Sequence, residues 1–177
     1  MAKILFIIPP KNFRDEELLE PQEILSHNNI IDIASNITGT CTGMLGTKVN
    51  ANLTLRDARA KISEYAAVIF VGGSGSNIYH NDVMAHAIAR AVVTNQNQVL
   101  AAICWAVVTL AKAEVLTGRK ITGWISPTGE EKKIFAEAKA IYQPKDVAAD
   151  GRIITASGPH AAYEFGEKIK QLLMHKV

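Results

Sequence analysis

Short apolar runs rich in branched side chains alternate along the chain with segments of helical character, and this alternation constrains the fold most. Strands buried on both faces have such a continuous apolar pattern. Strands of this sheet are predicted at residues 3–8, 30–35, 66–71 and 98–103, and a turn followed by a strand is predicted at residues 150–157. Because helical segments separate them, the strands are expected to run parallel, with helices on both faces. The sequence therefore predicts an α/β fold, with a doubly wound, mostly parallel sheet sandwiched by helices.

The predicted helices lie between these runs and after the last of them. Their residues are 17–29, 81–96, 105–113, 126–140 and 161–177. Pro21 is unusual in the first helix, and it either kinks the helix or lies in its first turn. Residues 38–56 are rich in Gly and Thr, which predicts short strands or a small β-hairpin. No linker or repeat interrupts the pattern, so residues 1–177 are predicted to form a single domain.

Charge and composition exclude several classes of protein. The formal net charge is +2 at pH 7 and Lys and Arg form no cluster, which argues against a nucleic-acid partner. The longest uncharged run, residues 99–111, is too short to span a membrane as a helix, and the N-terminus lacks a signal-peptide pattern. The cysteine and histidine spacings match no zinc site, and no cofactor or metal is expected. We therefore expect a cytoplasmic enzyme or binding domain.

The stretch AAICWAVVTL, residues 101–110, places Cys104 between a predicted strand and a predicted helix. In a nucleophile elbow, this sharp turn holds its central residue in a strained backbone conformation, and the positions two before and two after must be small. Here those positions are Ala102 and Ala106. The start of a helix favours a thiolate, which predicts a reactive thiol with a lowered pKa. The alternative is a buried apolar cysteine, and on spacing alone the two are equally supported.

Four landmarks in the same order resemble the ThiJ/PfpI family of the class I glutamine amidotransferase-like superfamily. They are KILFIIPPKNFRDEELLEP at the first strand, AAVIFVGGSG at the Gly-Gly loop, VLAAICWA at the cysteine elbow and GRIITASGPHAAYEFGEKI at the last strand and helix. The resemblance covers nearly the whole chain. It implies the flavodoxin-like fold of that superfamily, a reactive Cys104, and a homodimer or a higher homo-oligomer.

The resemblance also implies the roles of four residues. Cys104 is similar to the family's nucleophile, and Glu17 to the buried glutamate that hydrogen-bonds the thiolate. The backbone N–H groups of Gly73 and Trp105 would form an oxyanion hole. Burial pushes such a carboxyl toward its neutral form, so that it can donate a hydrogen bond. By proximity, Asp15 and Glu16 compete with Glu17 for this role, and otherwise they are solvated charges at a helix start.

The chain departs from the family pattern at two positions where other members carry histidine. Trp105 follows the elbow cysteine, where members described as peptidases have their base, and Trp124 occupies the matching position on the next loop. The tryptophans are expected either to line the pocket or to pack in the core. Of the five histidines, only His160 belongs to a loop on the predicted active face, as a catalytic base or as a solvent-facing residue. The others are expected at helix ends or on the surface: His27, His80, His86 and His175. Cys41 is predicted to be structural.

These features leave two main classes of function open. The first is a cysteine-dependent hydrolase or lyase that acts on a small carbonyl or amide compound, of the glyoxalase, deglycase or amidase type. Peptidase activity is not expected, because Trp105 offers neither a base nor an acid. The second is a non-enzymatic oxidative-stress sensor or chaperone-like protein that signals through oxidation of Cys104. A binding domain that keeps only the fold is a further alternative.

Overall fold

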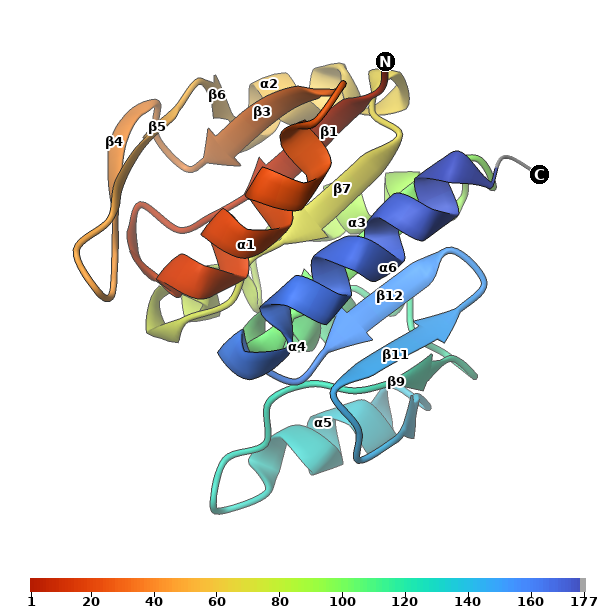
Figure 1. The fold of residues 1–177 in the computed structure, drawn as a ribbon. Coiled ribbons are helices and arrows are strands. Elements are labelled where there is room, and N and C mark those ends of the chain that lie inside the picture. Colours follow the sequence, from red (N-terminus) through yellow and green to blue (C-terminus); the bar gives the residue numbers. More distant parts are fainter. Residues whose placement is uncertain (176–177) are drawn as a thin grey trace.

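A seven-stranded sheet forms the centre of the computed structural model, which describes residues 1–175 (Figure 1). All neighbouring strands are parallel except the pair at one edge, β11 and β12. In spatial order the strands are β11 (Val147–Asp150), β12 (Ile153–Ala156), β8 (Val99–Ile103), β7 (Ala67–Phe70), β1 (Lys3–Ile7), β3 (Ile30–Ser35) and β6 (Leu53–Thr54). All five predicted strands belong to this sheet, which confirms the predicted fold class.

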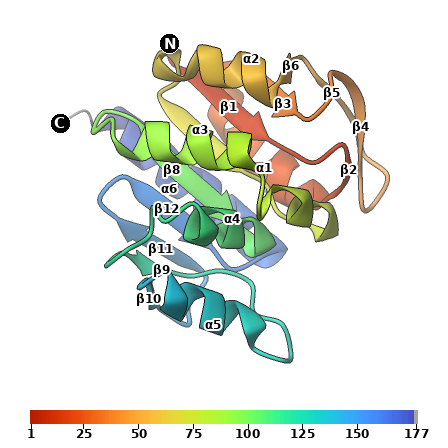
Figure 2. The ribbon, with the colours of Figure 1, turned by 180° about the vertical axis from the view of Figure 1, so that it is seen from behind.

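Helices cover both faces of the sheet (Figures 1 and 2). One face carries α1 (Asp15–Ser26) and α6 (Ala162–Met174), and the other carries α2 (Leu55–Ala60), α3 (Val83–Val93) and α4 (Val107–Lys112). Successive side chains of β1 point to opposite faces, as the period of a strand requires. Ile4 and Phe6 therefore pack with α1 and α6, whereas Leu5 and Ile7 pack with the other helices.

Two smaller sheets flank the central one. The predicted hairpin is formed by β4 (Gly39–Gly43) and β5 (Lys48–Ala51), which are antiparallel. A strand that was not predicted, β2 (Lys11–Phe13), pairs in parallel with β4. Two of its three residues are exposed, so its sequence lacks the apolar run that would predict a strand. At the other end, β9 (Lys120–Ile121) and β10 (Ile141–Tyr142) pair beside α5 (Glu130–Glu137), which packs against α4.

Pro21 lies inside α1 rather than in its first turn, and the helix continues through it. A proline in a helix interior has no N–H for the carbonyl four residues earlier. That carbonyl belongs to Glu17. Pro21 is buried where α1 crosses α6, beside Gly166, and the absence of a side chain at Gly166 allows the two helices to approach closely.

No helix within residues 1–175 is long and apolar enough to cross a membrane. The closing helix, predicted over 161–177, is α6, and residues 176 and 177 lie outside the described part of the chain. That residues 1–177 form a single domain stays a prediction.

Replacing Gly166 by valine is expected to destabilise the protein. A Cβ at this position would lie 2.9 Å from Cδ1 of Ile24 and 3.0 Å from the backbone Cα of Pro21. Overpacking of this kind costs about 1–3 kcal/mol of the free energy of unfolding, measured by urea denaturation. Glu164→Val, an exposed site on the same helix, is the control. An equal effect of both substitutions would contradict the assignment of the crossing point.

Candidate active site

Cys104 occupies a strained turn at the carboxyl end of β8. Its φ is +60°, the left-handed region that non-glycine residues rarely adopt. The flanking small residues Ala102 and Ala106 are both buried, and a short 3₁₀ turn, η3 (Cys104–Ala106), leads from Cys104 into α4. This is the elbow geometry that the spacing predicts. It holds the thiol beyond the end of the sheet, where ligands of such folds bind.

The Gly-Gly loop after β7 passes directly beside the thiol. A side chain at Gly72 would lie 2.7 Å from Cβ of Cys104 and would also meet the Glu17 carboxyl. Gly73 has a φ of +100°, and a side chain there would meet the backbone of Phe13 and Arg14. Neither position has room for a side chain, so both require glycine. The loop therefore approaches Cys104 closely enough for its backbone to form a hydrogen bond with the thiol.

Asp15, the first of the three acidic residues in the first turn of α1, binds the hairpin instead of the thiol. Its Oδ2 accepts a hydrogen bond from the Leu45 N–H at 2.8 Å, and its Oδ1 accepts one from the Thr47 N–H at 2.9 Å. Burial tends to raise the pKa of Asp15, but these hydrogen bonds outweigh burial and lower it. Asp15 thus holds the turn between β4 and β5, which carries Met44.

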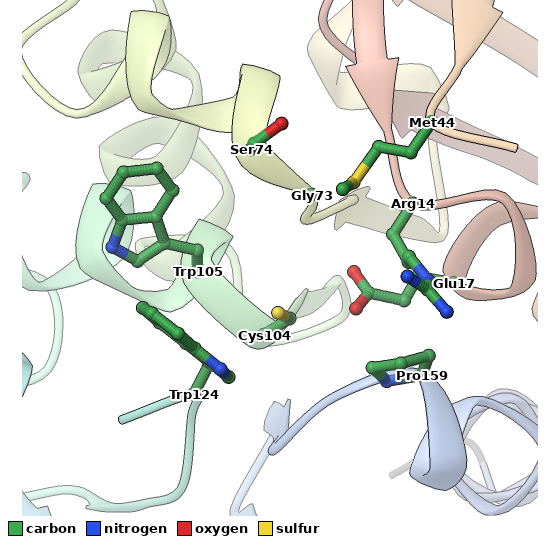
Figure 3. Close-up of a pocket in the computed structure, with 9 residues that line it drawn as sticks. All are labelled: Arg14, Glu17, Met44, Gly73, Ser74, Cys104, Trp105, Trp124 and Pro159. Carbon is green, nitrogen blue, oxygen red and sulfur yellow. The ribbon is translucent and has the colours of Figure 1, made fainter. Parts of the chain in front are cut away.

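Glu16 and Glu17 point in different directions. Glu16 pairs with Arg14 through two hydrogen bonds, of 2.7 Å to Nε and 2.9 Å to Nη2. Glu17 is fully buried, and its carboxyl is directed toward Cys104 (Figure 3). Of the three acidic candidates, the structure therefore brings only Glu17 to the thiol.

The Glu17 carboxyl and the Cys104 thiol are electrostatically coupled. Burial raises the pKa of Glu17 to about 7. Contacts with the Cys104 thiol and the Gly72 backbone lower this pKa, but they offset only part of the rise. Neither carboxyl oxygen has a hydrogen-bond partner of ordinary geometry among the described residues. The carboxyl is therefore held largely neutral below pH 7, and it has a proton available for a neighbouring acceptor.

The pKa of Cys104 is raised, which differs from the lowered value that the elbow alone predicts. Burial and the charge of ionised Glu17 raise it, whereas the backbone N–H groups of Trp105 and Gly73 lower it. The charge contribution disappears when Glu17 is protonated. The pair therefore favours one negative charge over two, and its two protons titrate as a unit.

A pocket of about 350 Å³ opens at the thiol (Figure 3). Its walls come from six separate parts of the chain. The lining residues are Arg14, Glu17, Met44, Gly73, Ser74, Cys104, Trp105, Trp124 and Pro159. Both tryptophans thus line the pocket, one of the two roles that the sequence leaves open for them.

His160 does not reach this pocket. Its imidazole is exposed, and Nε2 lies 3.0 Å from Oδ1 of Asp146 and 3.2 Å from Oγ of Ser157. It lines a different cavity, on the far side of Trp124. The structure therefore gives no support to His160 as a base for Cys104.

His80 was missed as a neighbour of the site, although it is buried. Its Nε2 donates to the Trp105 carbonyl at 3.1 Å, and its ring packs edge-to-face on the Trp105 indole, with centroids 4.9 Å apart. Burial lowers the pKa of His80 to about 4, so the ring is neutral at pH 7. The Gly-Gly loop and the short 3₁₀ helix after it, η2 (Ser74–Tyr79), carry His80 to this position, which no local sequence pattern indicates.

The remaining predicted residues lie away from the thiol. Cys41 is a buried residue of the hairpin strand β4, and burial raises its pKa. His27 and His175 are exposed. His86 is only half-buried, and its Nε2 donates to the His80 carbonyl at 2.9 Å.

Comparisons with known proteins match the chain over nearly its whole length. A sequence model of the DJ-1/PfpI family matches residues 2–172. An uncharacterized protein from Methanocaldococcus jannaschii is 38% identical over 171 residues, which cover 95% of this chain and 80% of that protein. The crystal structure of a ThiJ/PfpI domain protein from Brachyspira murdochii has a TM-score of 0.90 and 28% identity, over 97% of this chain and 96% of the other. Drosophila melanogaster DJ-1beta has a TM-score of 0.84 and 24% identity, over 97% and 90% of the two chains.

Gly72→Ala is expected to lower the free energy of unfolding by about 1–3 kcal/mol, because its Cβ has no room between Cys104 and Glu17. The φ of Gly72 is not in the left-handed region, so the effect is steric. Urea denaturation measures the change, with Asn77→Ala, an exposed site in the 3₁₀ helix η2 after this loop, as the control. A stability equal to that of the wild type would show that the gap between the loop and the thiol is wider than described.

The stability of the wild type is expected to fall as pH rises from about 4.5 to about 7, relative to Glu17→Gln. The folded pKa of Glu17 is about 7 and the unfolded value is about 4.3, so the folded state binds more protons in this window. The stabilisation is complete below the unfolded pKa and is lost through the folded pKa, by roughly 3 kcal/mol in all. Urea denaturation across this pH range measures it. Parallel pH curves for the two proteins would contradict the raised pKa.

Proposed function

Because the chain belongs to the DJ-1/PfpI family, we propose that it is an enzyme that uses Cys104 as a nucleophile on small carbonyl compounds. The observation that carries the proposal is the buried Glu17 carboxyl, directed at the thiol and with a pKa of about 7. General acid–base groups work best when their pKa lies near the operating pH. Glu17 can therefore donate a proton near neutral pH and then accept one.

The first step is addition of the Cys104 sulfur to the carbonyl carbon. The sulfur forms a bond to that carbon while the thiol proton passes to the Glu17 carboxylate. The π electron pair moves to the carbonyl oxygen, and the oxygen takes that proton from Glu17, which is again a carboxylate. The N–H groups of Trp105 and Gly73, whose hydrogen bonds to the sulfur oppose the rise in its pKa, stabilise the negative charge that develops on the sulfur as its proton leaves. The product is a hemithioacetal on Cys104 when the substrate is an aldehyde.

A 2-oxoaldehyde allows the reaction to continue with the same two residues. The Glu17 carboxylate removes the hydrogen from the carbon bonded to sulfur, which leaves an enediolate. Glu17 returns this proton to the neighbouring carbon, and the hydroxyl proton of the carbon bonded to sulfur moves to the oxygen of that neighbouring carbon. This leaves a thioester of a 2-hydroxy acid, which water hydrolyses to release the acid and the free thiol. The net reaction adds one water to the substrate, and Glu17 returns to its starting state.

Oxidation sensing is the second candidate function. A neutral Glu17 carboxyl and two backbone N–H groups surround the sulfur, and such donors would also stabilise the oxygens of a sulfinate. The two candidates differ in one measurable respect. In an enzyme, oxidation of Cys104 abolishes turnover, whereas a sensor has no turnover to lose.

Three further expectations accompany the proposal. The substrate is a small molecule, the protein is a homodimer or a higher homo-oligomer, and it is located in the cytoplasm. Peptidase activity is not proposed, because the indole of Trp105 lies where a base would be needed, and it is hydrogen-bonded to Glu131.

Turnover of methylglyoxal to lactate is expected for the wild type and not for Cys104→Ser. Glu17→Gln should lower kcat by about 10²–10⁴, the usual cost of losing a general acid–base group. Lactate release, followed by chromatography, measures the rate. The matched control is Glu23→Gln, an exposed site on the same helix. Equal turnover by the wild type and Cys104→Ser would contradict the proposal.

His160→Ala is expected to change this turnover by less than about twofold, because loss of a true base costs about 10²–10⁴ and the imidazole pairs with Asp146 outside the pocket. The same lactate assay tests it. A loss of a hundredfold, in a protein with unchanged circular dichroism, would place His160 in the mechanism.

A further inference from the structure

The charged residues that line the Cys104 pocket already interact with other residues of the protein. Arg14 and Glu17 are the only charged residues among the described residues of its lining. Arg14 forms two hydrogen bonds with Glu16, and the Glu17 carboxyl interacts with the Cys104 thiol. A substrate that carries a carboxylate or a phosphate therefore meets only a cation that is already paired with Glu16, and it would give up its hydration with little compensation.

An aromatic wall forms one side of the same pocket. The rings of Trp105 and Trp124 meet edge-to-face, with centroids 6.0 Å apart and planes at 71°. Met44 and Pro159 contribute further apolar surface (Figure 3). Aromatic groups gain from edge-to-face or offset packing on such rings, beyond the burial of their area.

Glu131 fixes the orientation of this wall from behind. Its Oε1 accepts a hydrogen bond from Nε1 of Trp105 at 3.2 Å. Its Oε2 accepts bonds from the N–H and the hydroxyl of Ser126, at 2.8 and 2.6 Å. Burial alone would raise the pKa of Glu131, but the hydrogen bonds from Ser126 and Trp105 lower it. Glu131 is thus a buried carboxylate that joins Trp105 to the loop carrying Trp124.

Two more contacts hold the wall at the thiol. The backbone N–H of Trp124 donates to the Cys104 carbonyl at 3.4 Å. The neutral ring of His80 packs against Trp105 and bonds to its carbonyl. The wall therefore has a defined position relative to the sulfur, which a loose surface tryptophan would not have.

The pocket is large enough for an aromatic substrate. Its volume is about 350 Å³, whereas a cavity of about 150 Å³ holds benzene. One ring and a two-carbon dicarbonyl group fit within this space.

We propose that the Cys104 pocket selects uncharged carbonyl compounds bearing an aromatic or similarly flat apolar group, which packs on Trp105 and Trp124, and that Glu131 is the positioning residue for this wall. The proposal rests on the proposed function, since it names the substrate class of the same site. Glu131 touches neither the substrate nor the thiol, and it acts through Trp105.

The first test compares three 2-oxoaldehydes. Phenylglyoxal should have a kcat/KM about tenfold higher than methylglyoxal, the upper part of what an aromatic contact contributes. 4-Carboxyphenylglyoxal, which differs from phenylglyoxal by one negative charge, should fall below phenylglyoxal by at least tenfold. A ratio near one in both comparisons, or a preference for the carboxylated compound, would overturn the proposal.

Variants then separate the wall from the charges. Glu131→Ala should raise KM for phenylglyoxal more than KM for methylglyoxal while kcat changes little, and Glu131→Gln should restore part of the difference. Ser126→Ala, which removes one of the two hydrogen bonds from Ser126 to Glu131, tests the same point if Glu131→Ala fails to fold. Glu130→Ala, the exposed neighbour, is the control. Glu16→Gln frees Arg14 and should raise kcat/KM for the carboxylated compound. Equal effects of Glu131→Ala on both KM values would contradict the role of Glu131.

Alkylation distinguishes failure of this proposal from failure of the proposed function. If no carbonyl compound is turned over, the proposed function fails, but the pocket can still be probed with three reagents that share the iodide leaving group. Iodoacetanilide should label Cys104 faster than iodoacetamide, and iodoacetate slowest, as measured by mass spectrometry of each cysteine. Glu131→Ala should reduce the advantage of the anilide. The opposite order of rates in the wild type would overturn the proposed selectivity independently of catalysis.

Discussion

The close approach of three backbone segments at Gly72 governs the geometry of the site. The end of β7, the elbow after β8 and the first turn of α1 converge there, and a single added methyl group would touch atoms of both Glu17 and Cys104. The parallel sheet supplies this convergence, because the ends of adjacent strands meet at one edge. The thiol and carboxyl are thereby held in mutual contact without a metal or a disulfide among the described residues. Their shared burial then determines their protonation.

Much of this framework could be predicted from the sequence, because it depends on local patterns. The strands β1, β7 and β8 at the centre of the sheet are buried apolar runs, and the small residues around Cys104 indicate the elbow. The strand β2 escaped prediction, since its pairing with β4 depends on the backbone and its side chains are mostly exposed. Pro21 could not be placed by local rules either, because its tolerance in the interior of α1 depends on packing against Gly166 of α6.

The candidate site was predictable where a motif marks the residue and not where partners come from distant segments. Spacing alone could not separate Asp15, Glu16 and Glu17, which differ only in what each faces in the fold: the hairpin, Arg14 or the thiol. Glu131 and His80 lie 26 and 25 residues from Trp105 in the sequence, and no motif links them. The thiol pKa was predicted in the wrong direction, because the elbow argument included the nearby N–H groups and omitted burial and the charge of Glu17.

The placement of the aromatic residues also gives this protein a built-in optical probe. The chain has two tryptophans in all, and both line the Cys104 pocket. Its four tyrosines do not line it. Indole emission excited at long wavelength therefore originates entirely from the wall of the candidate site. Occupancy of the pocket, oxidation of the sulfur and loss of the Glu131 contact all change the surroundings of the same two fluorophores, so each can be followed in solution without attaching a dye.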